Sequence, residues 1–122
     1  MIGYVSVGTN DLAKAGAFYD ALLGEMGAKR VMDLGRMVIW GTGAGKPMFA
    51  LCTPYDGQAA CVGNGVMVAL AASSREEVDR LYAKAIELGA TDEGAPGARM
   101  PTFYGGYFRD LDGNKLNFFY MG

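Results

Sequence analysis

The chain has 122 residues, 51% of them hydrophobic and 20% charged, and carries a formal net charge of −2. This length fits one domain, or two small halves that share a core. The charge balance gives no support for a nucleic-acid partner, because phosphate contacts need a basic patch and the Lys and Arg residues are scattered. No run of 18 apolar residues occurs and the first residues lack a signal-peptide pattern, so we expect no membrane partner.

Two residue counts bear on chemistry. The sequence contains no histidine and two cysteines, Cys52 and Cys61. Neither cysteine lies in a redox or catalytic motif, so we expect reduced thiols and a cytoplasmic protein. Histidine is the commonest protein metal ligand and the usual acid–base group near neutral pH. Any catalysis must therefore rely on other side chains or on a bound cofactor.

The first half of the chain predicts a strand, a helix and three further strands. Residues 4–8 alternate as a strand, and residues 12–24 carry apolar side chains at spacings typical of an amphipathic helix. Asn10 or Asp11 can cap that helix. Glycine-containing turns then separate three expected strands, over residues 29–34, 36–41 and 47–54.

A similar order of elements begins again in the second half. Residues 65–70 read as a strand, and Ser73 or Ser74 begins a helix with a capping-box pattern that ends at Gly89. A stretch rich in glycine and proline follows over 93–101. The remaining segments are residues 103–108, a turn over 110–114 and a last strand over 115–120.

The two halves align with each other. Tyr4 precedes Gly27 by 23 residues and Met67 precedes Gly89 by 22. This repeat predicts an α+β fold of two tandem β-α-β-β-β modules, about 1–58 and about 62–122, in a single domain of residues 1–122. Neither half could bury both faces of its sheet alone. Side by side, two such sheets would form a curved, cup-like mixed sheet with helices outside, and its open inner face would suit a small molecule.

The order and spacing of several segments cover nearly the whole chain and are similar to one known family. The segments are 5–12 running into 17–20, then 74–79, Gly89-Ala90, and Tyr107-Phe-Arg-Asp-Leu-Asp-Gly-Asn-Lys115. The chain resembles the vicinal oxygen chelate superfamily, the group of glyoxalase I, bleomycin-resistance proteins and extradiol dioxygenases. The resemblance implies paired modules, usually a homodimer, and a metal held by His, Glu or Gln side chains from four strands. It says little about which reaction is performed.

Carried over residue by residue, the family's four metal-ligand positions hold other side chains here. They are Tyr4, Met48, Met67 and Asn117. Divalent first-row metals prefer imidazole, carboxylate or thiolate, whereas thioethers are soft, weak ligands and a neutral phenol is poor. We therefore expect no bound metal and no other cofactor.

A pocket of aromatic and sulfur-bearing side chains is expected in place of the metal. Alternation along the last strand points Asn117 and Phe119 inward if Leu116 and Phe118 pack under a helix. Methionine adapts to irregular shapes and aromatic rings offer stacking surface, so a flat or apolar ligand would suit the cup. The expected ligand-binding residues are Tyr4, Ser6, Trp40, Met48, Met67, Tyr107, Asn117 and Phe119.

Three functions stay open on the sequence. The leading one is metal-independent binding of a small organic molecule, as bleomycin-resistance proteins do by sequestration. The second is a glyoxalase-like lyase or isomerase with Tyr4 as its catalytic acid or base, acting on a small carbonyl or glutathione-conjugated substrate. The third is a structural domain with a vestigial pocket, in which Tyr4, Met48 and Met67 only fill the core. Arg109 is expected to fix its turn by pairing with Asp110 or Asp112.

Overall fold

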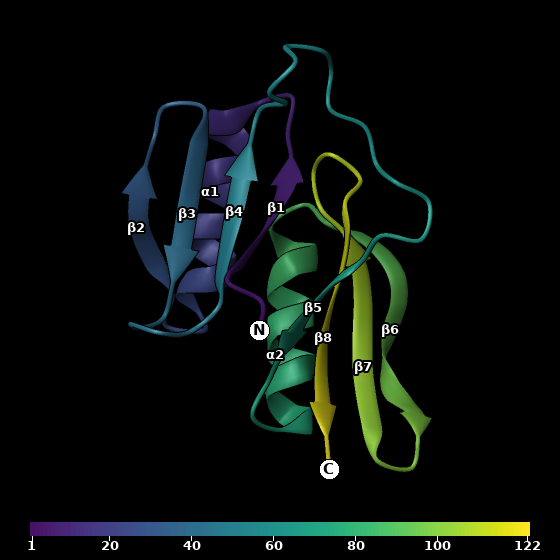
Figure 1. Cartoon of the computed structure of the whole chain (residues 1–122). Helices are drawn as coiled ribbons and strands as arrows, with labels where there is room; N and C mark the ends of the chain where they lie inside the picture. The colour runs from purple at the N-terminus through teal and green to yellow at the C-terminus, as the bar shows by residue number, and fades with distance from the viewer. The chain divides into compact units, whose positions relative to one another are not determined.

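The computed structural model describes all 122 residues, and the chain divides into two compact units, Met1–Val62 and Gly63–Gly122 (Figure 1). Each unit has the element order β-α-β-β-β, which confirms the predicted α+β class and its two modules. The first unit comprises β1 (Tyr4–Gly8), α1 (Leu12–Gly24), β2 (Lys29–Asp33), β3 (Met37–Gly41) and β4 (Met48–Cys52). The second comprises β5 (Val68–Ala71), α2 (Arg75–Glu87), β6 (Thr91–Met100), β7 (Phe103–Arg109) and β8 (Lys115–Met121).

The two sheets have the same topology. Their strand orders are β1-β4-β3-β2 and β5-β8-β7-β6. In each sheet the first strand runs parallel to the last, and the other neighbours are antiparallel. The sheets are therefore mixed, as the sequence predicts, whereas the cup formed by the two together stays a prediction. Neither helix has the length and apolar character needed to cross a membrane.

The core of the first unit lies between α1 and one face of its sheet. Tyr19 of α1 lies 4.7 Å from Phe49 and 5.9 Å from Trp40, measured between ring centroids, and all three side chains are buried. The apolar positions of α1 recur every three or four residues, so a single stripe of the helix meets the sheet. Aromatic rings supply most of the buried area there.

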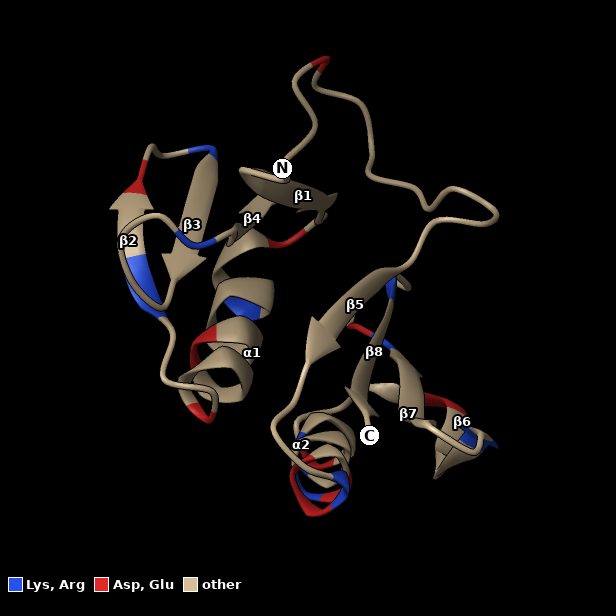
Figure 2. Ribbon diagram, turned by 60° about the horizontal axis from the view of Figure 1, so that its bottom comes forward, with Lys and Arg blue, Asp and Glu red and all other residues tan.

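The core of the second unit has the same plan with different side chains. Val78 and Leu81 of α2 are fully buried, as are Leu116 and Phe118 of β8. A Cβ atom on Gly106 of β7 would lie 3.1 Å from the Tyr82 ring, so the missing side chain lets α2 approach the sheet closely. Figure 2 shows acidic and basic residues gathered along α2, whereas α1 carries few charges.

Side-chain caps fix where both helices begin. Asp11 is the N-cap of α1 and accepts a hydrogen bond from the backbone N–H of Lys14 at 3.1 Å. Ser74 caps α2 in the same way, accepting from the N–H of Glu77 at 3.0 Å. The Glu77 carboxylate accepts in turn from the N–H of Ser73, one residue before the cap, so the reciprocal bond of the predicted capping box is present in a shifted form. The sequence left two candidates at each helix, and the structure selects Asp11 and Ser74.

Equivalent glycines end the two helices. Gly27 has φ 81° and Gly89 has φ 107°, in the left-handed region that favours glycine. The next residue in each case donates a backbone hydrogen bond back into the helix, Ala28 to Leu23 and Ala90 to Ala85, both at 3.0 Å. The sequence repeat thus extends to the way in which the two helices end.

The stretch over 93–101 is strand rather than irregular chain, although it is rich in glycine and proline. β6 covers ten residues and pairs with β7 through three register shifts. Such shifts are β-bulges, and Pro96 is tolerated because β6 is an edge strand. Elsewhere the predicted strand over 65–70 begins only at Val68, and the strand over 47–54 shortens to Met48–Cys52.

The turn before β8 is held by a single carboxylate. Asp110 accepts hydrogen bonds from the backbone N–H groups of Asp112 and Asn114 and from the Asn114 side-chain amide, each at 2.9 Å. Arg109 has a structural role here, but the predicted partners were wrong. Its Nε donates to Glu93 at 2.6 Å and its Nη1 to the carbonyl of Gly113 at 3.1 Å. A partner on β6 could not be read from the local sequence.

Candidate functional site

Strand register places three predicted site residues on one face of the first sheet. Tyr4 pairs with Met48 across β1 and β4, and Ser6 pairs with Ala50. Phe49, next to Met48, contacts Tyr19 of α1. Because successive side chains of a strand point to opposite faces, Tyr4, Ser6 and Met48 lie on the face that α1 does not cover.

On this helix-free face Tyr4, Ser6 and Met48 are uncharged, and Lys29 of β2 pairs with Gly41 toward the edge of the sheet. Tyr4 is 54% exposed, so its hydroxyl is accessible to a ligand. Ser6 is exposed and Met48 is half-buried. The Met48 Cγ lies 3.3 Å from where a Cβ on Gly41 would be, so the methionine side chain extends over β3. A phenol, a hydroxyl and a thioether are therefore presented side by side.

Trp40 does not belong to this surface, and its assignment to the ligand-binding residues is corrected. It pairs with Phe49, so it lies on the face covered by α1, and it is only 1% exposed. Its indole Nε1–H donates to the Asp20 carboxylate at 3.0 Å, and the Arg30 guanidinium lies 5.4 Å from the ring centroid. Trp40 is a core residue because its polar N–H finds a partner on α1.

The predicted inward-facing residues of β8 lie on the helix-free face of the second unit. Asn117 pairs with Ala69 of β5 and with Tyr107 of β7, and Phe119 pairs with Gly105. The alternate residues Leu116 and Phe118 are fully buried on the α2 side, as the alternation predicts. Asn117, Tyr107 and Phe119 are thus neighbours on one surface.

Asn117 is the most unusual side chain in the molecule. It is fully buried, and neither its amide oxygen nor its amide nitrogen has a hydrogen-bond partner in the chain. An unsatisfied buried polar group costs about 1–3 kcal/mol, so native proteins seldom leave one without a reason. The Nδ2 atom lies 3.6 Å from where a Cβ on Gly105 would be, on the side of the sheet away from α2. Both atoms are also closed to solvent, so the chain leaves a buried donor and a buried acceptor side by side.

Aromatic rings surround this amide. Phe119 stacks on Phe103 with centroids 5.5 Å apart and an interplanar angle of 3°. Tyr107, the direct neighbour of Asn117, lies beneath two cationic groups, Arg99 at 5.2 Å and Lys115 at 5.7 Å from its ring centroid. The surface thus combines stacking area, positive charge and an unpaired amide.

Met67 lies just outside the second sheet. It immediately precedes β5, is 41% exposed, and the register partner of Asn117 is Ala69. The two registers nevertheless agree, because the last pairs are Gly8 with Cys52 and Ala71 with Phe119, so the pair Ala69–Asn117 corresponds to the pair Ser6–Ala50. β5 has only four residues, against five in β1, and Met67 therefore falls outside it.

The metal that the resemblance implies does not fit the side chains present. The implied positions offer a phenol, two thioethers and an amide, none of which is a preferred ligand of a divalent first-row metal. Nowhere in the chain do three or more His, Cys, Asp or Glu side chains gather in a way that could hold a metal ion. No chemistry is therefore derived through a metal at these positions.

Asp20, Tyr82 and Tyr104 have shifted pKa values, and each lies on a helix or bonds to one. The Arg30 guanidinium, followed by the Trp40 indole, lowers the pKa of Asp20. Burial and a 2.5 Å hydrogen bond to Asp92 raise the pKa of Tyr82 to about 12. A hydrogen bond to Asp79 raises the pKa of Tyr104, whose hydroxyl is thereby directed toward α2. These contacts serve helix packing.

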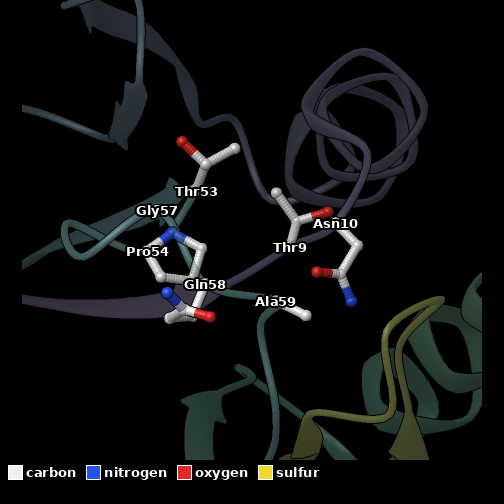
Figure 3. Close-up of a pocket in the computed structure, with 7 residues that line it drawn as sticks. All are labelled: Thr9, Asn10, Thr53, Pro54, Gly57, Gln58 and Ala59. Atoms are coloured by element: carbon white, nitrogen blue, oxygen red, sulfur yellow. The ribbon is translucent and has the colours of Figure 1, made fainter.

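Sequence reasoning missed a polar hollow in the first unit. It has a volume of about 350 Å³ and lies between the end of β1 and the segment after β4 (Figure 3). The Asn10 side chain holds that segment in place, accepting from the N–H of Ala60 at 2.7 Å and donating to its carbonyl at 3.2 Å. This contact spans 50 residues, and no local pattern reveals it. The lining residues are Thr9, Asn10, Thr53, Pro54, Gly57, Gln58 and Ala59.

Comparison with solved structures finds close counterparts of the whole fold. The chain is similar to a glyoxalase/bleomycin resistance protein from Albidiferax ferrireducens T118, with 36% identity, a TM-score of 0.91, and coverage of 100% of this chain and 99% of that one. A hypothetical protein from S. aureus shares 29% identity with a TM-score of 0.76, over 98% and 92% of the two chains. A lactoylglutathione lyase from Agrobacterium tumefaciens shares 25% identity with a TM-score of 0.71, also over 98% and 92%.

A family model gives the same answer. The model described as Glyoxalase/Bleomycin resistance protein/Dioxygenase superfamily matches residues 1–118. No match is found among functionally curated proteins. The extent of the family match and the agreement in fold leave one conclusion, that the chain belongs to the glyoxalase/bleomycin resistance protein/dioxygenase superfamily.

Proposed function

We propose that this protein binds a small organic molecule on helix-free sheet surface, without a bound metal ion. The observation that carries the proposal is the unpaired, fully buried amide of Asn117, at a position where the family resemblance implies a metal ligand. An amide is a poor metal ligand but a good hydrogen-bonding group for an organic molecule. The function therefore rests on recognition rather than on metal chemistry.

Side chains on the helix-free face of each unit, taken separately, support an organic ligand. Tyr107 and Phe119 offer ring faces beside Asn117, and Tyr4 and Ser6 offer hydroxyl groups on the first sheet. Methionine side chains, here Met48 and Met67, adapt to ligands of irregular shape. Binding pockets commonly combine such apolar surface with a few polar groups that orient the ligand.

The first test separates metal from organic ligand. Chelator-treated protein is titrated calorimetrically with Zn²⁺, Ni²⁺ and Mn²⁺ near neutral pH, and we expect no binding in the micromolar range. The same protein is then screened by ligand-observed NMR against small planar acids, amides and hydrocarbons. We expect at least one saturable ligand whose affinity does not change with chelator.

Matched variants complete that test. Met67→Ala should change the affinity of the ligand found, whereas Met26→Ala, beyond the end of α1, should not. Tight binding of one metal ion per chain would restore a metal-dependent enzyme. The absence of any organic ligand would favour a vestigial pocket.

A lyase or isomerase is the second candidate function. It is favoured by the similarity to a lactoylglutathione lyase and by the accessible hydroxyl of Tyr4. On this proposal Tyr4 moves a proton on a small carbonyl or glutathione-conjugated substrate. Tyr4→Phe should then abolish turnover of hemithioacetals of glutathione while leaving the circular dichroism spectrum unchanged. Saturable binding without turnover in the unaltered protein would decide for sequestration.

We further propose a cytoplasmic homodimer. The two cysteines are free thiols, which suits a reducing compartment, and the family resemblance implies pairing of chains. Light scattering with size-exclusion chromatography should give twice the mass of 12.9 kDa.

A further inference from the structure

Two cationic side chains beside Asn117 form no ion pair. Arg99 and Lys115 both approach the Tyr107 ring, and neither lies within ion-pair distance of a carboxylate. Arg109, the third basic residue nearby, is paired with Glu93 at 2.6 Å, and Lys115 also lowers the pKa of Glu93 through its charge. One carboxylate thus faces two of the three cations, and the helix-free face of the second unit keeps an excess of positive charge next to an unpaired amide.

The backbone directs both cations onto this face. Lys115 precedes Asn117 by two residues on β8, so the two side chains share a face. The Arg99 guanidinium folds back over the bare surface of Gly97, with Nη1 2.9 Å from where a Cβ would lie. Its Nη2 donates to the carbonyl of Ala95 at 2.7 Å, which holds the group over β6. Gly97 pairs with Gly105, so Arg99 lies on the same side of the sheet as Asn117.

We infer that this surface recognises a planar organic anion of one chemical class, a heterocyclic lactam that bears a carboxylate. The inference rests on the proposed function and specifies its ligand. A lactam edge presents an N–H donor next to a C=O acceptor, which complements the Oδ1 acceptor and Nδ2 donor of Asn117. The carboxylate matches Arg99 and Lys115, since charge-assisted hydrogen bonds are the stronger kind.

The flat ring of such a ligand also matches the surroundings. The Arg99 guanidinium covers the positions of Gly94 and Gly97, and the rings of Tyr107, Phe103 and Phe119 lie around Gly105, so a flat ligand would stack on planar groups. Aromatic stacking adds to affinity beyond the area buried. A purely apolar ligand would leave the amide and both cations unsatisfied, and a neutral lactam would leave the cations.

The test uses 2-pyridone-5-carboxylate and three relatives, each lacking one feature, with the full-length protein in calorimetry. The N-methyl derivative removes the donor, nicotinate removes the whole lactam edge, and 2-pyridone removes the carboxylate. We expect each to bind at least about tenfold more weakly than the parent probe, because a buried hydrogen bond or charge pair is lost. Raising the salt concentration should weaken the carboxylate probes and not 2-pyridone.

Variants assign the effect to particular residues. Asn117→Leu should abolish binding without unfolding the protein, since it keeps the branch point and the number of side-chain heavy atoms and removes an unsatisfied amide. Arg99→Gln and Lys115→Gln should each weaken the parent probe several-fold and leave 2-pyridone unchanged. Arg75→Gln is the matched control, because Arg75 lies 5.2 Å from the Tyr104 ring on the α2 side and should have no effect.

The outcomes separate this inference from the proposed function. Equal affinity for the probe and its N-methyl derivative, or no change in Asn117→Leu, would overturn the lactam class. Equal loss in Arg75→Gln and Arg99→Gln would overturn the role of the cations. If other molecules bind saturably while the pyridone carboxylate does not, the inference fails and the proposed function stands. If nothing binds at all, both fail.

Discussion

The two units share one topology and present different chemistry on the faces that their helices leave open. In the first unit that face offers Tyr4, Ser6 and Met48, all neutral. In the second, Asn117 occupies the position that Ala50 holds in the first, and Arg99 and Lys115 lie nearby. The difference teaches that the repeat preserves the backbone, with its sheet order and helix ends, while side chains on the open faces diverge. A shared fold therefore does not give the two faces a shared role.

The largest expected effects test whether each unit has its own core. Leu22→Ala in α1 and Leu81→Ala in α2 each remove a fully buried side chain and should lower the free energy of unfolding by about 3 kcal/mol. Trp40 is the only tryptophan and reports on the first unit alone. In urea titrations Leu22→Ala should shift the fluorescence midpoint, and Leu81→Ala should shift mainly the far-ultraviolet circular dichroism. Coincident shifts of both signals in both variants would mean that the two units unfold as one, and would contradict the view that each unit has an independent core.

The glycines that end the helices allow a finer comparison. Gly27→Ala and Gly89→Ala should each lower the free energy of unfolding by about 1 kcal/mol, because both residues have positive φ. Gly89→Ala should be the worse, since its Cβ would also lie 3.2 Å from Leu111, whereas nothing lies within 4 Å at Gly27. Gly24→Ala is the control. Gly24 is helical with open space around it, so alanine should stabilise by about 0.5–1 kcal/mol. Equal losses at Gly27 and Gly89 would remove the steric distinction between the units.

The smallest expected effects are dependences on pH. The folded protein lowers the pKa of Asp20 below its ordinary value of 3.8, so this carboxylate stabilises the first unit above that pH. The contribution is lost as the pH falls through the lowered pKa. Because Asp20 is 47% exposed, it amounts to at most about 1 kcal/mol. Asp20→Asn should flatten the acid limb of stability measured by Trp40 fluorescence, and an unchanged limb would contradict this assignment.

Tyr82 provides the alkaline counterpart in the second unit. Its pKa rises from 10.0 to about 12 on folding, so the protonated phenol is favoured in the native state. The stabilisation is complete below pH 10 and is lost as the pH rises toward 12. Tyr82→Phe should remove this dependence in circular dichroism measurements between those values. If the alkaline pH dependence of stability persists in Tyr82→Phe, another group causes it, and Tyr104 would be tested next.

Much of the fold could be predicted because it depends on local patterns. A few neighbouring residues determine the apolar spacing of α1 and α2, their capping residues and the alternation around Asn117. The internal repeat then supplied the element order of both units. Even β6, whose glycines and proline disguise it, follows from the requirement that the second unit match the first.

What could not be predicted depends on contacts between distant residues. Alternation divides β3 into two faces but does not say which one α1 covers, so Trp40 was placed on the wrong face. The pairing of Arg109 with Glu93 and of Asn10 with Ala60 likewise joins separate segments. The sequence also could not reveal that the Asn117 amide lacks a partner, because this depends on every residue around it.

The glycine at position 105 has a consequence for how the second unit could be silenced. A side chain there would begin 3.6 Å from the Asn117 amide nitrogen, and Gly105 does not have the positive φ that would forbid one. Gly105→Ser would place a hydroxyl group, which can both donate and accept, beside the unpaired Asn117 amide. In this variant the serine hydroxyl would compete with any ligand for the Asn117 amide and act as a covalently attached inhibitor. On the proposal that an outside molecule bonds to Asn117, binding therefore requires glycine at position 105.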